Sequence, residues 1–244
     1  MDSAQFIRNS VSDVDRGRMT IAGDPELASA VSAVKIYQSL RFQNSYRDLI
    51  ASGPYQAAAR FFLEELYGCV DYSRRDAQFA RIAGAIERLL PQQAVATAVA
   101  LARLHAMTEQ LDLLMGRAWL AAPATEVLAE TYVFAWHTVG QEEQRASQLQ
   151  LVLRLGRDLD RLTRTPGLRL AMKMMRRPAH AAGLHELQLF LESGFDIFAS
   201  LAKRKTGAEG FLSLIEARES ELMRVLFANN VDIDRLLREA ILPS

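Results

Sequence analysis

Apolar residues recur at helical spacing along most of the chain, whereas the alternating pattern of strands is almost absent. The clearest run extends from Leu149 to Leu162, where apolar residues follow one another at intervals of 3, 3, 4 and 3 positions, as on one face of an amphipathic helix. Neither an Asn-Gly nor an Asp-Gly hairpin turn occurs, and these are the strongest short hairpin signals. The pattern predicts an all-α fold, a single multi-helix bundle of about 8–9 helices.

Prolines, glycines and small polar residues indicate where these helices begin and end. Asp24 followed by Pro25 is typical of a helix start, and Pro166-Gly167 of a helix stop. On these signals we expect helices at residues 25–50, 54–68, 73–90, 92–114, 125–140, 142–164, 168–175, 184–202 and 211–227, with a short tail helix after them.

The same signals suggest a simple domain organisation. Residues 1–24 are polar and end in Gly-Asp-Pro, so we expect a flexible N-terminal arm. Residues 25–244 are expected to form a single helical domain, because the connections are short and no fixed-period repeat occurs. The most plausible sub-boundary lies near residues 164–167, where a proline and a glycine interrupt the helical pattern.

One segment has an unusually dense motif. Residues 61–68 read Phe-Phe-Leu-Glu-Glu-Leu-Tyr-Gly, and residues 73–76 read Ser-Arg-Arg-Asp. This arrangement resembles that of an uncharacterised bacterial family of helical proteins, whose motif is Phe-Phe, Leu-Tyr-Gly and Ser/Thr-x-Arg-Asp. Residues 184–198 also resemble the C-terminal half of that family, although Cys69 stands where a proline is expected. The resemblance implies a shared helical fold and no activity.

The residues of this motif suit a corner between two helices. Gly68 permits a left-handed turn, and Asp71 and Ser73 are suited to hydrogen-bond local backbone. Ser73 with Asp76 three residues later resembles a capping box. The functional alternative is an anion-binding site formed by Arg74 or Arg75 with the free amides at the helix start.

The histidines do not form a metal motif. A His-Glu-x-x-His sequence is missing, and no histidine has a glutamate three residues before it, as di-iron bundles require. Non-covalent haem needs only one axial histidine in an apolar pocket. His137, which follows Tyr132 and Trp136, and His105 are therefore the candidate cofactor-binding residues, with haem or another hydrophobic molecule as ligand.

Composition narrows the class of protein further. Lys and Arg together number 29, as do Asp and Glu, and this balance argues against nucleic-acid binding, which needs a basic footprint. The single cysteine, Cys69, allows no internal disulfide, so we expect a cytoplasmic protein. It follows a predicted helix C-terminus, where a thiolate is disfavoured, and we expect it to be inert. No apolar run is long enough for a transmembrane segment.

Two stretches are candidate contact surfaces for a homo-oligomer or a protein partner. The first is the seam at 149–162. The second is residues 172–177, Met-Lys-Met-Met-Arg-Arg, which could also meet a membrane surface weakly; the structural alternative is a surface helix with its methionines packed inward. Because no complete catalytic constellation occurs, we favour a non-catalytic binding or protein-interaction module of a bacterial cytoplasm. The alternative is a helical pocket protein that binds haem through His137 or His105.

Overall fold

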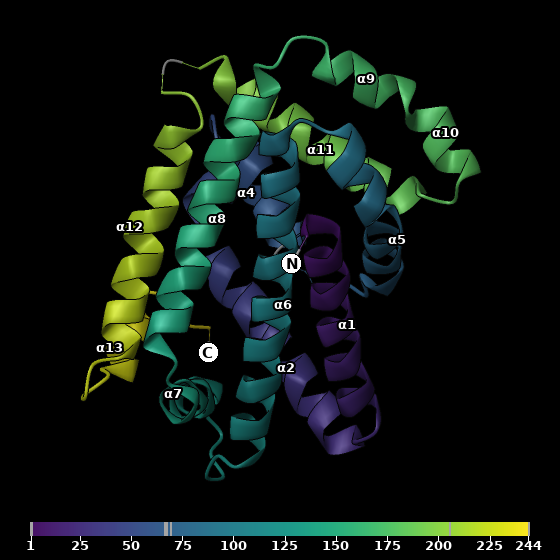
Figure 1. Cartoon of the computed structure of the whole chain (residues 1–244). Helices are drawn as coiled ribbons and strands as arrows, with labels where there is room; N and C mark the ends of the chain where they lie inside the picture. The colour runs from purple at the N-terminus through teal and green to yellow at the C-terminus, as the bar shows by residue number, and fades with distance from the viewer. Residues whose placement is uncertain (1, 66–67, 69, 205, 244) are drawn as a thin grey trace. The chain divides into compact units, whose positions relative to one another are not determined.

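The fold comes from a computed structural model (Figure 1), which describes residues 2–65, 68, 70–204 and 206–243. Within these ranges the chain is all-α, without a strand, and forms thirteen helices, more than the predicted 8–9. In chain order they are α1 (Ser3–Ala22), α2 (Pro25–Ser45), α3 (Arg47–Ala51), α4 (Gln56–Glu65), α5 (Ser73–Leu89), α6 (Gln92–Leu120), α7 (Leu128–Val139), α8 (Glu142–Thr163), α9 (Leu168–Met174), α10 (Arg176–Ala181), α11 (His185–Ala202), α12 (Glu209–Leu226) and α13 (Ile233–Arg238).

The contacts divide the chain into two compact units, each built from three separate stretches. Unit 1 contains residues 1–15, 71–107 and 150–213, and unit 2 contains residues 16–70, 108–149 and 214–244. The sub-boundary predicted near 164–167 lies inside unit 1. That residues 25–244 form one domain stays a prediction. No helix among the described residues is both long enough and apolar enough to cross a membrane.

The N-terminal segment differs from the predicted flexible arm, because α1 extends over 20 of its residues. Ile7, Val11 and Val14 of α1 are buried, and their spacing of four and three places them on one helix face. In unit 1, Ile7 belongs to the core cluster that includes Phe79 and Ala83 of α5. These buried residues are few and are surrounded by polar ones, so the polar composition of the segment did not indicate a packed helix.

Other differences have local causes. The helix predicted at 25–50 is interrupted at Tyr46, whose backbone leaves helical geometry and whose side chain is fully buried. The Tyr46 hydroxyl donates a hydrogen bond to Glu219 Oε1 over 2.9 Å. Residues 176–181, between two predicted helices, are helical as well and form α10. Pro178 is its third residue, where the missing N–H has no helical partner to lose.

Each unit has its own apolar core. In unit 1 the apolar side of α6 faces α5 and α8, and Leu155 of the predicted seam packs with Ala100 and Leu104. Four leucines of that seam region are buried, at positions 149, 153, 155 and 162. Most of the seam is therefore used for internal packing, whereas Val152 and Leu159 are half-buried. That the seam contacts a partner stays a prediction.

The core of unit 2 is aromatic. Tyr37 of α2 stacks on Tyr132 of α7 with ring centroids 4.6 Å apart, and Trp136 contacts Phe227 with centroids 5.4 Å apart. The Tyr37 hydroxyl donates to the backbone oxygen of Pro243 over 3.0 Å, which fixes the C-terminal segment to this core. Aromatic pairs of this kind add about 0.5–1.5 kcal/mol beyond the burial of their area.

Candidate functional site

The start of α5 is organised by a local turn. Asp71 accepts a hydrogen bond from the Ser73 amide over 2.9 Å, which confirms its predicted bond to local backbone. The Ser73 hydroxyl donates to the Asp71 carboxylate over 3.0 Å, a side chain and not the backbone partner that was predicted. The predicted capping box is wrong, since the residue at the N-cap position is Tyr72 and it makes no side-chain cap. Leu66, Tyr67 and Cys69 lie outside the described residues, so the predictions for them remain predictions.

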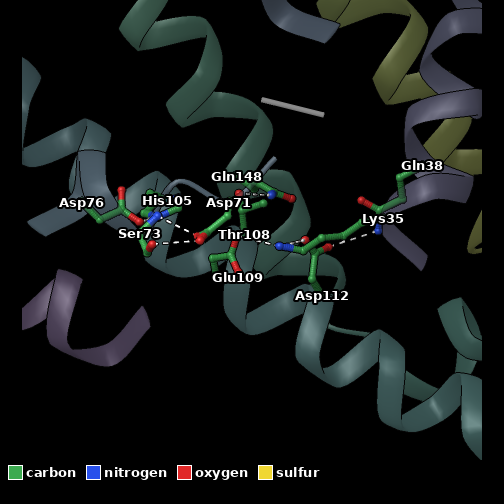
Figure 2. A network of polar contacts seen from close by, with 10 residues as sticks. All are labelled: Lys35, Gln38, Asp71, Ser73, Asp76, His105, Thr108, Glu109, Asp112 and Gln148. Atoms are coloured by element: carbon green, nitrogen blue, oxygen red, sulfur yellow. Dashed lines mark hydrogen bonds and ion pairs between the residues drawn. The ribbon is translucent and has the colours of Figure 1, made fainter. Parts of the chain in front are cut away.

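The Asp76 side chain does not cap the start of α5 but points toward α6. Its side chain is almost fully buried, and its Oδ2 lies 2.8 Å from Nε2 of the half-buried His105. Figure 2 shows the two side chains facing each other, with Asp71 and Ser73 nearby. A carboxylate in this position fixes the orientation and tautomer of an imidazole. The tertiary structure thus joins the family-like motif to one of the predicted histidines.

An oriented histidine is only part of a catalytic site. Within the described part of the chain, His105 has no hydrogen bond to a hydroxyl or thiol that could act as a nucleophile, as nucleophilic catalysis requires. No three metal-ligating side chains (His, Cys, Asp or Glu) lie together among those residues either. The Asp76–His105 pair is therefore best explained as a buried hydrogen bond that ties α5 to α6.

Removing the imidazole tests this role. We expect His105→Ala to lower the free energy of unfolding by about 1–3 kcal/mol, because the buried Asp76 carboxylate loses a hydrogen-bond partner. Urea denaturation followed by circular dichroism measures the change. His137→Ala is the matched control, since His137 is exposed and its loss should change stability by less than about 0.5 kcal/mol. Equal stability of the two variants would contradict the assignment.

The two arginines of the motif point to different partners. The Arg75 guanidinium lies over the rings of Tyr72 and Phe190, 3.9 and 4.3 Å from their centroids. The exposed Arg74 lies 3.5 Å from Glu186. Since aromatic faces and a carboxylate already engage these cations, the geometry does not favour the predicted anion site at Arg74 and Arg75.

The two histidines that are alternative haem ligands have different surroundings. Tyr132 and Trp136 are buried in the aromatic core of unit 2, whereas His137 is exposed on α7. His105 belongs to unit 1, and its Nε2 is engaged by Asp76. An axial ligand needs an enclosed apolar environment. The described residues therefore do not fit a haem site at His137, and at His105 one ring nitrogen is already taken.

Unit 2 contains a cluster of charged residues that the sequence analysis missed. Figure 2 shows Lys35 of α2 directed toward α6, where its Nζ lies 2.8 Å from Glu109 and 3.7 Å from Asp112. Gln38 donates to Asp112 Oδ1 over 3.2 Å. The only available signal was Asp112 itself, a charge next to Leu111 on the buried face of α6.

Burial controls the electrostatics of this cluster. Asp112 is 5% exposed, and desolvation raises the pKa of its carboxyl to about 6, although Lys35 acts in the opposite direction. Burial lowers the pKa of Lys35, but the charges of Asp112 and Glu109 more than offset this, so its pKa lies above the ordinary value. The cluster thus contains one carboxylate that folding makes harder to ionise.

A buried arginine completes the polar interior of unit 2. The Arg145 guanidinium lies 3.6 Å above the Trp136 ring, and its Nε donates to the Gly140 backbone oxygen over 3.4 Å. Desolvation lowers the Arg145 pKa from its ordinary value. Stacking on indole partly compensates a buried cation. These groups face an aromatic core, so we read them as part of the packing of unit 2.

The basic Met-rich segment at residues 172–177 is exposed, unlike the buried charges of unit 2. In unit 1, α9 has no buried residue, and α9 and α10 run along α11 (Figure 1). Polar contacts hold α9 and α10 there: Arg169 lies 2.8 Å from Asp196, Arg176 pairs with Glu192, and Gln188 donates to the Met172 backbone oxygen over 2.9 Å. Met174 and Met175 are 70% and 51% exposed, so the alternative in which the methionines pack inward is wrong for these two.

Comparison with known proteins gives the family of the chain. No curated protein and no solved structure has significant similarity to it. A family model described as a domain of unknown function, DUF8198, matches residues 18–233. The match includes the Phe-Phe and Ser-Arg-Arg-Asp segments and most of both units. The chain therefore belongs to this uncharacterised family, the domain of unknown function DUF8198.

Proposed function

We propose that this protein is a non-catalytic interaction module of a bacterial cytoplasm, and that it binds an acidic protein surface through α9 and α10. The observation that carries the proposal is the exposure of Leu170 and Met174, at 63% and 70%, in a helix without a buried residue. Apolar side chains gathered on a basic surface mark interaction sites. Methionine is common on surfaces that adapt to a partner.

The charges of this surface suggest the chemistry of the partner. Arg169 and Arg176 are neutralised by carboxylates of α11. Lys173 and Arg177 are exposed and make no ion pair among the described residues. Lys173 lies near enough to Glu192 for its charge to lower the pKa of that carboxyl, which leaves Arg177 as the cation without a nearby carboxylate. Exposed cations beside exposed methionines fit a partner with acidic residues around an apolar patch. A membrane surface is less favoured, because α9 has seven residues, and membrane-surface helices are usually much longer.

Photo-crosslinking tests this proposal. A photoreactive amino acid placed at Met174 is expected to give an adduct with one defined protein in cells, identified by mass spectrometry. The matched control is Met19, which is 74% exposed on α1 and should give no such adduct. The purified partner is then titrated against the wild-type chain and against Lys173→Glu with Met174→Asp. We expect the double variant to weaken binding at least about tenfold, because it removes an apolar contact and reverses a charge.

The outcomes separate the alternatives. Adducts confined to lipids would favour a membrane surface, and the same protein adduct from positions 19 and 174 would indicate nonspecific capture. Either result would overturn the proposed interaction. Unchanged affinity of the double variant for the captured protein would also overturn it.

A further inference from the structure

A second feature of unit 1, away from α9 and α10, is a cavity of about 480 Å³ between the end of α8 and the turn before α12. Arg157, Arg161 and Arg164 of α8 and Arg204 line it, together with the carboxylates of Asp160 and Glu209. The three α8 arginines are four and three positions apart, so they lie on one face of the helix. Four cations against two anions leave an excess of two positive charges at this cavity.

The arginines are not equally engaged. Arg157 forms a two-point ion pair with Glu209, at 3.0 and 2.8 Å, and Arg164 lies 3.0 Å from Asp160. Arg161 is 3.6 Å from Asp158, which is not part of the cavity lining. Arg204 is exposed and makes no ion pair among the described residues. Arg204 therefore carries an uncompensated charge, and Arg161 shares the single carboxylate of Asp158 with Arg154.

The turn before α12 lies close to one of these guanidinium groups. Gly207 adopts a left-handed conformation, with φ of +58°, in the turn that precedes α12. A Cβ atom at Gly207 would lie 3.8 Å from Nη2 of Arg164, so this guanidinium lies close to the turn. The 18-residue α12 follows at once, and its amides at Gly210, Phe211 and Leu212 already donate to the backbone oxygens of Thr206 and Ala208, so the guanidinium groups are the available donors.

We propose that this cavity binds a small molecule through a phosphate or diphosphate group. Guanidinium groups match phosphate oxygens in pairs, and they are preferred where a phosphate is recognised by geometry. The volume is within the range of about 300–1,000 Å³ of small-molecule sites. An extended nucleic acid is not favoured, because the cationic excess is local and the chain has no net charge. This proposal is independent of the interaction surface on α9 and α10.

Calorimetric titration of the full chain with pyrophosphate tests the proposal. We expect saturable binding, and we expect Arg161→Ala with Arg204→Ala to weaken it at least about tenfold, the effect of losing charge-assisted hydrogen bonds. Arg154→Ala is a matched control: Arg154 and Arg161 both flank Asp158, at 3.7 and 3.6 Å, but Arg154 does not line the cavity. The affinity of the Arg154→Ala variant for pyrophosphate should equal that of the wild type.

A variant that binds more tightly cannot be explained by misfolding, so it serves as a second test. Glu209→Gln removes one cavity carboxylate and releases Arg157, so it should bind pyrophosphate several-fold more tightly. Inorganic phosphate should bind more weakly than pyrophosphate. Vesicles that contain phosphatidic acid distinguish a lipid headgroup from a free phosphate compound. Absence of saturable binding, equal loss in Arg154→Ala, or weaker binding by Glu209→Gln would each overturn the proposal.

Discussion

Gly116→Ala is expected to lower the free energy of unfolding by about 2 kcal/mol, although alanine is the better helix former. Gly116 lies in α6, where it faces Val31 of α2 within unit 2. A Cβ atom there would overlap the Val31 side chain and lie 3.2 Å from the Val31 backbone N and Cα. Valine is stiff about its first side-chain torsion. The two helices would therefore have to move apart, with a loss of core contacts on both sides.

Gly17→Ala is the matched control for this substitution. Gly17 lies within α1, and a Cβ atom there would have no heavy atom within 4 Å. Alanine should therefore stabilise the protein at this position by about 0.5–1 kcal/mol, the usual gain over glycine within a helix. Urea denaturation of both variants measures the two changes. Stabilisation by Gly116→Ala would show that α2 and α6 are not in close contact there.

Asp112→Asn is expected to raise the free energy of unfolding at neutral pH by about 3 kcal/mol, from a pKa shift of about two units. Burial raises the pKa of the Asp112 carboxyl from 3.8 to about 6. The folded protein therefore holds this proton at pH values where the unfolded chain has already lost it. The stability of the wild type falls for this reason as the pH rises from about 4 to 6. An amide at this position cannot ionise, so the variant lacks this decrease.

Comparison across pH makes the sign of this effect measurable. Below about pH 3 the carboxyl is protonated in both states, and the variant and the wild type should have similar stability. The difference should grow up to about pH 7 and then stay constant. Denaturant unfolding at a series of pH values measures it. A variant that is less stable than the wild type at neutral pH would show that Lys35 more than offsets the burial of Asp112.

Asp48→Asn provides a control of opposite sign. The Arg218 guanidinium donates hydrogen bonds to both carboxylate oxygens of Asp48, each over 2.7 Å, and holds the Asp48 pKa below its ordinary value. Asp48 thus contributes stability above its unfolded pKa, and this contribution is lost as the pH falls through the folded pKa. The variant should be slightly less stable at neutral pH, with a gap that closes on acidification.

Sequence periodicity predicted the positions of helices better than it predicted which side chains form contacts from one helix to another. The ranges expected for α5, α8 and α11 agree with the structure to within about two residues at each end. The candidate site was less predictable. His105 was singled out as a haem ligand, but its partner proved to be Asp76, whereas the Lys35–Asp112 cluster was missed. A charged residue on an apolar face shows its importance only when the partner from another helix is known.

The sequence by itself determined the all-α class, most helix boundaries and the family-like motif, because helical periodicity, capping and proline effects act within a few residues. Only the tertiary structure decided which charges are buried and paired. Asp76 meets His105 across 29 positions, Lys35 meets Glu109 across 74, and Arg41 meets Glu219 across 178. It also decided that Leu153 and Leu155 are buried while Met174 is exposed. An apolar pattern predicts that a helix has an apolar face, but neighbouring helices determine whether that face is covered.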